Sequence, residues 1–363
     1  AALKERKINS PVYILKADGG TLPLDKSVQM PVETIFSGPA ASIMGVMALT
    51  DPGQSSVVVD IGGTTTDLAL ILSGRPLLSA KGARVGSLLT HVRAFAVKSI
   101  AIGGDSAVAV CGQNNGGKSS NGLTVGPHRD GPPLCMGGNG PTPTDALRVL
   151  GLSQIGDAAK AEKAMQIVAD GLGCTAMQAA QKVVDSVVDK IVFEVNEMFR
   201  EWEQEPAYRI WEIMKRESLS AQSVVGVGGG APALVPLVAA RLKAAAIVPQ
   251  YASVANAIGA AVARPTLTLN LHIDTESKEY AVAEDGLTGR VTNQKMTLEE
   301  AERLARRLLA ERAELLGISE YAAEAEVTYS EVFNMIRGWS TVGRLMDVRM
   351  EIPAGLLPSW GRC

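Results

Sequence analysis

The sequence has few cysteines, no excess of charge of either sign, and no apolar run of membrane-spanning length. Its four cysteines, Cys111, Cys135, Cys174 and Cys363, lie far apart without a CxxC pair, so we expect neither a zinc ribbon nor a disulfide framework. A reducing cytoplasm fits this best. The net charge of −3 argues against a nucleic acid or a membrane surface recognised through bulk charge. Small molecules or other subunits are the expected partners, and the chain could form a hetero- or homo-oligomer.

The first residues of the sequence contain neither a hydrophobic signal core nor an initiator methionine. We therefore expect the sequence to be a piece of a longer polypeptide. Its 363 residues exceed one typical domain, and 46% hydrophobic content is ample for a sizeable core. Two or three domains are expected.

The most informative stretch is at residues 57–72, which read VVVDIGGTTTDLALIL. Two apolar runs rich in β-branched residues flank a glycine and threonine turn, a pattern that predicts a buried hairpin with a polar tip. Gly62 and Gly63 let backbone amides approach a ligand closely, and Thr64, Thr65 and Thr66 add hydroxyl donors. The tip suits an oxyanion, although a plain glycine-turn hairpin is the alternative.

Two carboxylates accompany this tip. Asp60 ends the first predicted strand and can hold a metal-bound water, which a polyphosphate with Mg²⁺ requires. Asp67 is a second carboxylate at the tip, with a turn-capping role as its equal alternative.

A second glycine turn follows a short buried strand at residues 223–227. Gly228, Gly229 and Gly230 break this strand, and Pro232 marks the start of a helix. In such a turn the backbone can lie flat against a nucleotide and the helix dipole can face it. A tight turn without a ligand is the alternative.

The hairpin string resembles the phosphate hairpin of the actin, sugar-kinase and Hsp70 ATPase superfamily, and within it the hydantoinase A and 5-oxoprolinase family. Three further strings support the resemblance by their order and spacing: FSGPAAS at 36–42, VGVGGGAP at 225–232 and ASVANAIGAA at 252–261. The resemblance implies an α/β fold with a ribonuclease H-like (actin-like ATPase) lobe. It also implies an adenosine loop at Gly228, Gly229, Gly230 and Ala231, and hinge helices at 40–49 and 252–263.

The domain boundaries expected from these observations are at about residues 50 and 265. Residues 1–50 would be the tail of a missing first lobe and an inter-lobe helix with Ser37 as N-cap, and residues 51–265 the ATPase lobe. Within that lobe, residues 82–143 are glycine-rich without helical periodicity and predict an irregular insertion, before helices at 145–150 and 158–202. Residues 266–363 predict a small α+β module, whose helix begins with a capping box at Thr297 and Glu300.

A second phosphate-loop candidate must be weighed, because residues 112–119 satisfy G-x-x-x-x-G-K-[ST]. That motif works only when a helix begins at its lysine, here Lys118. The residues that follow, Ser120, Asn121 and Gly122, have turn chemistry instead. We therefore predict a surface turn at this motif.

The predicted insertion also gathers potential metal ligands: His91, Asp105, His128, Cys135 and Asp145. No HxH, HxxxH or CxxC pair occurs among them, so separately satisfied residues are the expectation. Family members frequently carry a His-Thr pair in this region, where the present chain has Lys98 and Ser99. Asp105 is of more interest, because a carboxylate held on a glycine turn could contact substrate or metal.

The resemblance implies an ATP-dependent cyclic amidohydrolase that opens hydantoin or 5-oxoproline, with ATP and Mg²⁺ as cofactors. An unstrained amide carbonyl is a poor electrophile, and transfer of the γ-phosphoryl group to its oxygen would make ring opening favourable. Asp60 would orient Mg²⁺ or its water, the segment from Gly62 to Thr66 would hold phosphates, and Gly228 to Ala231 the adenosine. Asp67 and Asp105 are the further catalytic candidates.

Two alternatives stay open, a subunit of an ATP-dependent acetone or acetophenone carboxylase and a non-catalytic ATP-driven interaction or activator protein. In the superfamily two lobes close on the nucleotide, each with one phosphate hairpin, and only one such hairpin is found in this sequence. The other lobe is therefore expected upstream on a longer polypeptide or on a partner subunit. This chain alone is expected to be at most a weak ATPase.

Overall fold

The computed structural model describes residues 5–7, 10–51, 53, 55–79, 82–85, 88–90, 92–110, 122–204 and 220–360. Contacts divide the chain into two compact units, one formed by Ala1–Ile35 with Ala263–Leu357 and the other by Phe36–Val262 with Pro358–Cys363. Each unit packs helices against a β-sheet, which confirms the predicted mixed α/β class. Among the described helices none combines the length and the apolar character needed to cross a membrane.

The larger unit is built on a six-stranded sheet in the order β12-β11-β3-β4-β5, with β8 also pairing with β4. The strands are β3 Ser55–Ile61, β4 Thr66–Leu72, β5 Arg75–Pro76, β8 Val97–Ile100, β11 Ser223–Val227 and β12 Ala245–Ile247. β3 and β4 form the predicted antiparallel hairpin. On the other side of β3, β11 runs parallel to β3 and β12 runs parallel to β11. Parallel neighbours need a crossover connection, and the helix Ala231–Leu242 supplies the one between β11 and β12.

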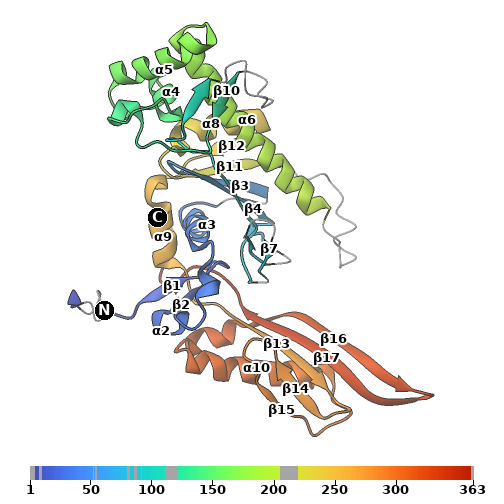
Figure 1. Cartoon of the computed structure of the whole chain (residues 1–363). Coiled ribbons are helices and arrows are strands. Elements are labelled where there is room, and N and C mark those ends of the chain that lie inside the picture. Colours follow the sequence, from blue (N-terminus) through green and yellow to red (C-terminus); the bar gives the residue numbers. More distant parts are fainter. Residues whose placement is uncertain are drawn as a thin grey trace. The chain divides into compact units, whose positions relative to one another are not determined.

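Helices cover both faces of this sheet (Figure 1). On one side lie α4 Pro143–Val149, α5 Ala158–Leu172, α6 Ala176–Glu203 and α8 Ala231–Leu242. On the other lie α3 Ser37–Leu49 and α9 Ala255–Val262, the latter preceded by η3 Ala252–Val254. Because both faces are covered, β3 is buried along most of its length and reads as a continuous apolar run.

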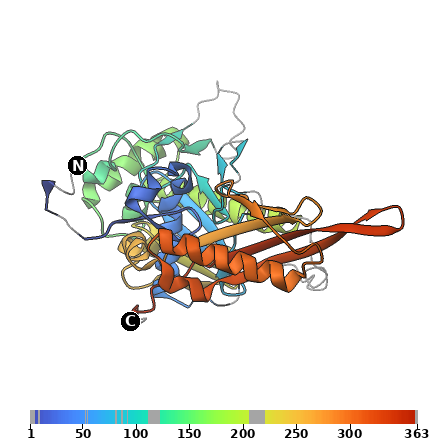
Figure 2. The same cartoon turned by 90° about the horizontal axis from the view of Figure 1, so that it is seen from below.

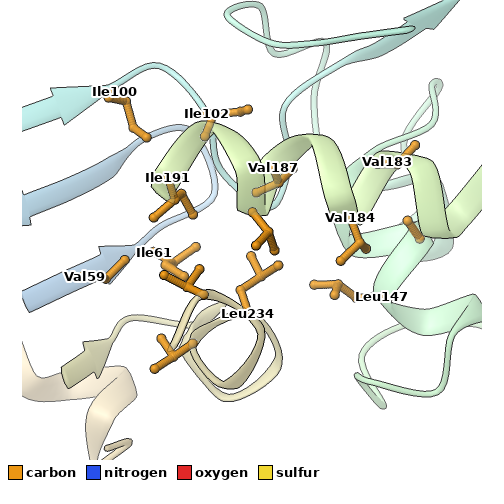
Figure 3. Close-up of a cluster of buried hydrophobic side chains, with 14 of the residues drawn as sticks. Val59, Ile61, Ile100, Ile102, Leu147, Val183, Val184, Val187, Ile191 and Leu234 are labelled. Atoms are coloured by element: carbon orange, nitrogen blue, oxygen red, sulfur yellow. The ribbon is translucent and has the colours of Figure 1, made fainter. Parts of the chain in front are cut away.

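The core between the sheet and α6 depends on helical periodicity (Figure 3). Val183, Val184, Val187 and Ile191 of α6 are buried in one hydrophobic cluster that also contains side chains of β3 and α8. Each fully buried aliphatic side chain contributes about 1.5–3 kcal/mol relative to its exposed state. α6 begins with a capping box, which defines where this face starts. The cluster anchors the end of β3 from which the polar tip projects.

The prediction of an irregular insertion at residues 82–143 is wrong in one place. There, Val97–Ile100 forms strand β8 of the main sheet, with Thr66 opposite Ile100. A four-residue strand that is only partly buried leaves little periodic signal in the sequence. The rest of residues 82–143 holds short elements: β6 Arg84–Val85, β7 Leu88–Leu89, β9 Val108–Val110, β10 Leu123–Val125 and η2 Leu134–Met136. The motif at residues 112–119, as well as Cys111, His91 and Cys363, lie outside the described residues.

The start of α3 also differs from expectation, because Ser37 is its first helical residue and Phe36 is the N-cap. Phe36 adopts a left-handed conformation, with φ of 61°, and turns the chain one residue earlier than predicted. No side chain caps the helix, so the prediction of Ser37 as N-cap was wrong.

α3 and α9 cross with their backbones in direct contact. A Cβ atom on Gly45 would overlap the carbonyl oxygen of Ala255, and one on Gly259 would overlap that of Ala41. Only glycine permits this approach at both positions. The predicted small-residue helices therefore pack against each other within this unit.

The smaller unit contains a five-stranded antiparallel sheet in the order β15-β14-β13-β17-β16, with α10 on one face (Figure 2). The elements are β13 Leu267–Asp274, β14 Glu279–Val282, β15 Thr288–Arg290, α10 Leu298–Leu315, η4 Ser319–Glu324, β16 Glu326–Arg337 and β17 Ser340–Ile352. The unit also includes β1 Tyr13–Leu15, β2 Thr21–Pro23, α2 Leu24–Ser27 and η1 Pro31–Thr34. The predicted capping box of α10 is confirmed, since Thr297 and Glu300 exchange both hydrogen bonds.

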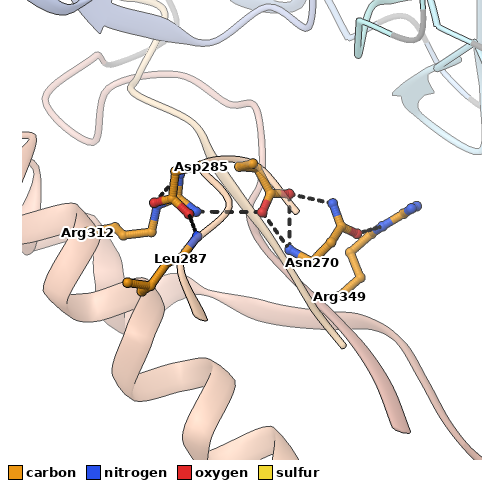
Figure 4. Close-up of polar contacts among 6 residues, drawn as sticks. Asn270, Asp285, Leu287, Arg312 and Arg349 are labelled. Carbon is orange, nitrogen blue, oxygen red and sulfur yellow. Dashed lines mark hydrogen bonds and ion pairs between the residues drawn. The ribbon is translucent and has the colours of Figure 1, made fainter. Parts of the chain in front are cut away.

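Polar contacts join α10 to two of these strands (Figure 4). Arg312 of α10 forms ion pairs with Glu284 at 3.6 Å and Asp285 at 3.4 Å. Glu284 accepts a hydrogen bond from the backbone N–H of Asn270, whose side-chain oxygen in turn accepts one from Arg349 at 2.6 Å. The network ties α10 to β13 and β17 within this unit.

The crossing of α3 and α9 predicts that Gly45→Ala destabilises the protein by about 2 kcal/mol or more, because the new methyl group has no space. Gly38→Ala is the matched control, since Gly38 lies exposed in the same helix with no atom within 4 Å of its Cβ position. Urea denaturation followed by circular dichroism measures both free energies of unfolding. Equal effects of the two substitutions would contradict the described contact.

A buried carboxylate links α6 to β8 and makes part of the stability pH-dependent. Glu194 lies 2.8 Å from Nζ of Lys98 and 2.5 Å from Nζ of Lys190. Burial raises the pKa of Glu194, but hydrogen bonds and charge from the two lysines outweigh burial and bring the pKa below 4.5. A carboxyl group with a lowered folded-state pKa stabilises the fold above its unfolded pKa and loses this effect as the pH falls.

We therefore expect Glu194→Gln to cost about 2 kcal/mol of unfolding free energy at pH 7. The difference from the unsubstituted protein should shrink as the pH falls below 4.5. Glu201→Gln is the control, because Glu201 pairs with the same Lys98 but its side chain is 60% exposed, against 11% for Glu194. A pH-independent difference for Glu194→Gln would show that its charge is not what stabilises the contact.

Candidate functional site

The tip of the β3–β4 hairpin presents backbone donors to solvent. Gly63, Thr64 and Thr65 are exposed, and among the described residues no hydrogen-bond partner is found for their amides. The amide of Gly62 instead donates to the carbonyl of Thr65 at 3.0 Å, which closes the turn. The hydroxyl of Thr66 is buried and donates to the carbonyl of Ile102 at 2.8 Å. The donors available to a ligand are therefore those of Gly63, Thr64 and Thr65.

A loop at residues 103–105 holds this tip from one side. The amide of Gly104 donates to the carbonyl of Gly62 at 3.0 Å, and the amide of Asp105 donates to that of Gly63 at 2.7 Å. A Cβ atom on Gly103 would lie 2.6 Å from the Gly63 carbonyl oxygen, so the two backbones touch. The carbonyls of Gly62 and Gly63 share their peptide groups with the amides of Gly63 and Thr64. The two hydrogen bonds therefore fix the orientation of these amides as well, which preorganises them.

Asp60 and Asp67 lie directly opposite each other where β3 and β4 reach the tip. The hydroxyl of Ser42, from α3, donates to Oδ2 of Asp60 at 2.5 Å. Burial raises the pKa of Asp67; a hydrogen bond from Ser99 lowers it, and the nearby negative charge of Asp60 raises it further. Two like charges so placed favour a cation or a proton between them.

The donor set at this point fits Mg²⁺. Carboxylate oxygens are its preferred protein ligands, and Mg²⁺ is usually held by one or two carboxylates together with substrate phosphates. Asp60 and Asp67 supply two such groups beside the exposed amides. Within the described part of the chain no cluster of three or more His, Cys, Asp or Glu could form a complete protein cage.

The glycine turn Gly228 to Gly230 is fastened to the same end of β3. The amide of Gly230 donates to the carbonyl of Ile61 at 3.1 Å, and that of Gly228 to the carbonyl of Ala252 at 2.9 Å. Ala231 is buried, and its amide donates to Gly228 at 3.3 Å. Gly229 is exposed, with no atom within 4 Å of its Cβ position. The helix α8 therefore begins beside the hairpin, and Gly229 is the exposed residue of the turn that precedes it.

An ion pair beside the tip was not foreseen from the sequence. Nη2 of Arg129 lies 2.7 Å from Oδ2 of Asp105. The same carboxylate oxygen would lie 2.6 Å from a Cβ atom on Gly63. Asp105 also borders a cavity of about 30 Å³, which has room for about one water molecule.

Two of the other metal-ligand candidates, Asp145 and Cys135, have local explanations. Asp145 is buried and accepts hydrogen bonds from the amides of Leu134, Cys135 and Thr142 and from the Thr142 hydroxyl, as part of the capping box of α4. Burial, followed by the effect of Asp145, raises the pKa of Cys135 to about 12. Cys135 is therefore a protonated thiol at neutral pH.

The structure thus brings together all the predicted site residues around the end of β3: Asp60, Asp67, Asp105, Gly62 to Thr66 and Gly228 to Ala231. Sequence reasoning missed the contacts of Ser42 and Arg129. Ser42 is part of the string at 36–42, but no spacing rule connects it to a carboxylate 18 positions away. Arg129 follows a strand of only three residues and has no motif around it.

Comparisons with known proteins bear on the family and the fold of this chain. A model of the hydantoinase/oxoprolinase family matches residues 1–268. An uncharacterized protein of Methanocaldococcus jannaschii is 26% identical over 247 residues, which cover 63% of this chain and 32% of that protein. Nucleotide-free acetone carboxylase aligns with a TM-score of 0.66 and 17% identity, over 98% of this chain and 54% of that chain. The present chain spans about a third and about half of the lengths of these two proteins, and the structural likeness shows the fold.

The geometry of the glycine turn predicts that Gly228→Ala destabilises the protein by about 2 kcal/mol and displaces Asp60. Gly228 has a φ of +85°, and its added methyl group would lie 2.5 Å from Oδ1 of Asp60. Gly229→Ala, next in the chain, should leave stability within about 0.5 kcal/mol of the original value. Chemical denaturation measures both, and a neutral Gly228→Ala would contradict the described conformation.

Proposed function

Because the chain belongs to the hydantoinase/oxoprolinase family, we propose that it forms one wall of the nucleotide site of an ATP-dependent enzyme that opens a cyclic amide such as hydantoin or 5-oxoproline. The observation that carries this proposal is the convergence of three features at the end of β3. These are the exposed amides of Gly63 to Thr65, the paired carboxylates Asp60 and Asp67, and the glycine turn before α8. Oxyanion donors, a cation site and a backbone surface are what a bound Mg²⁺–nucleotide needs.

The fold of the larger unit supports this proposal. In the spatial order β8-β4-β3-β11-β12, an antiparallel hairpin extends to a third strand on one side and to two parallel strands on the other. We interpret this sheet as a ribonuclease H-like lobe of the actin-like ATPase type. In that interpretation the hairpin tip is the phosphate-binding element and the turn at Gly228 to Ala231 contacts the adenosine.

Asp60 and Asp67 would hold Mg²⁺, which neutralises charge on the phosphates when bound. The residues of this chain provide the rest: Gly63, Thr64 and Thr65 orient the phosphate oxygens, and Ser42 fixes the rotamer of Asp60. Phosphoryl transfer depends on positioning and on neutralisation of charge more than on covalent participation of the protein. The site supplies both without a nucleophile.

In the proposed reaction, the amide oxygen attacks the γ-phosphorus, the bond to the bridging oxygen breaks, and ADP leaves. The phosphorylated carbon is a stronger electrophile than the amide. Water then adds to it, the ring C–N bond breaks, and the leaving nitrogen takes up a proton. A second water hydrolyses the resulting acyl phosphate to carboxylate and phosphate.

A second candidate is a subunit of an ATP-dependent ketone carboxylase, which the likeness to acetone carboxylase over 98% of this chain supports at the level of the fold. Both reactions activate a carbonyl oxygen, so both would use the same site. The test uses the complete polypeptide or complex that contains this chain, and it compares ATP turnover with hydantoin, with 5-oxoproline, and with acetone plus bicarbonate. Stimulation by a cyclic amide alone supports the first reaction, and stimulation that requires both ketone and bicarbonate supports the second.

We further propose that a second lobe, on the same polypeptide or on a partner subunit, completes the site. A wall formed by one lobe leaves the β- and γ-phosphates partly solvated, which weakens the preorganised donors. This chain alone should therefore bind MgATP with little turnover. Full-rate turnover by the isolated chain would exclude a second lobe.

The choice of phosphate-binding element predicts that Asp60→Asn weakens MgATP binding about tenfold or more, because Mg²⁺ loses a charged ligand. Lys118→Ala should leave MgATP affinity unchanged, since the motif at residues 112–119 is not predicted to be a P-loop. Titration calorimetry with MgATP measures both. The opposite pattern, with loss of binding only in Lys118→Ala, would place the phosphate site in the other motif.

A further inference from the structure

We propose that Arg129, held beside the hairpin tip by Asp105, binds the terminal phosphate of ATP and so makes the site prefer ATP to ADP. This inference rests on the proposed function, because it requires that a nucleotide binds at the tip. Arg129 would be a binding residue in direct contact with the γ-phosphate.

The backbone fixes the position of Arg129. The residue before it, His128, accepts a hydrogen bond from the amide of Ala107 at 2.8 Å, and Ala107 accepts one from the amide of Gly126 at 2.9 Å. Ala107 is two residues from Asp105, whose own amide is bonded to the Gly63 carbonyl at 2.7 Å. Two hydrogen-bonded steps therefore connect Arg129 to the tip. A single carboxylate oxygen, Oδ2 of Asp105, separates the guanidinium from Gly63.

The charges explain why an arginine is needed there. Asp105 places a carboxylate against Gly63, where it would repel an incoming phosphate. The guanidinium of Arg129 balances this charge. An ion pair whose arginine is 44% exposed contributes little to stability, so a purely structural purpose explains the pair poorly.

The guanidinium also has donors to spare. Of its five N–H groups, the described residues engage one at Nη2, with Asp105, and one at Nε, with the carbonyl of Gly131 at 3.3 Å. The exposed remainder of the fork can reach an oxyanion without releasing Asp105. Charge-assisted bonds of this type are strong and match the geometry of phosphate. When the nucleotide phosphates bind at the exposed amides of Gly63 to Thr65, the γ-phosphate is the outermost phosphate group. This is the group that would contact the guanidinium of Arg129.

The experiment measures the affinities of the Mg²⁺ complexes of a β,γ-methylene ATP analogue and of ADP, for five proteins. These are the unsubstituted chain, Arg129→Ala, Asp105→Asn, the double variant, and Arg241→Ala as control. Arg241 is the matched control because its side chain is 48% exposed and it pairs with Asp185 and Asp189 on α6. Circular dichroism and denaturation of each variant report whether the fold is retained.

We expect Arg129→Ala to weaken the ATP analogue about tenfold or more and to change ADP affinity less than about twofold. Arg241→Ala should change neither. Asp105→Asn in the Arg129→Ala background should recover part of the lost analogue affinity, because it removes the uncompensated charge. A residue that merely stabilises the loop would affect both nucleotides equally and show no such recovery.

The outcomes separate this inference from the proposed function. If the unsubstituted chain binds both nucleotides and Arg129→Ala weakens both equally or neither, the inference is wrong and the nucleotide site stands. If the unsubstituted chain binds neither nucleotide, the proposed function fails and takes the inference with it.

Discussion

The double-sided burial of β3 is the constraint on which the rest of the larger unit depends. This strand is hydrogen-bonded to β4 on one edge and β11 on the other, and its faces contact α6 and α8 on one side and α3 on the other. A strand held in this way has no freedom to shift its register. Its end therefore provides fixed points, namely Asp60, the carbonyl of Ile61 and the turn that starts at Gly62. Asp105, Gly228 and Gly230 each lie against one of these points.

The charge distribution of the site follows from this placement. Three carboxylates lie at this end of the sheet, those of Asp60, Asp67 and Asp105. Among the described residues, the one ion pair found for them joins Asp105 to Arg129. Exposed backbone amides supply the positive potential close to the tip, and Ser42 supplies a neutral donor. Such a site is acidic when empty. Under the proposed function, a polyphosphate would therefore bind as its complex with a divalent cation, because the carboxylates repel the free anion.

Local patterns predicted much of this chain. The hairpin at residues 57–72, the glycine turn before α8 and the capping box at Thr297 were recognisable because glycine turns, strand runs and helix caps are encoded by neighbouring residues. β8 was missed because four half-buried residues carry no period that distinguishes them from a loop. The contacts of Ser42 with Asp60 and of Arg129 with Asp105 join residues 18 and 24 positions apart. They exist only through tertiary packing, which no sequence window contains.

The glycine contact between α3 and α9 has a mechanical consequence. Two helices whose side chains interdigitate resist sliding past each other. At Gly45 and Gly259, by contrast, α3 and α9 meet backbone against backbone. α3 also carries Ser42, one turn from that crossing, and the Ser42 hydroxyl donates a hydrogen bond to Asp60 at 2.5 Å. A small rotation of α3 about this crossing would lengthen or shorten that hydrogen bond. The position of α3 therefore controls one of the contacts that orient the Asp60 carboxylate in the candidate cation site.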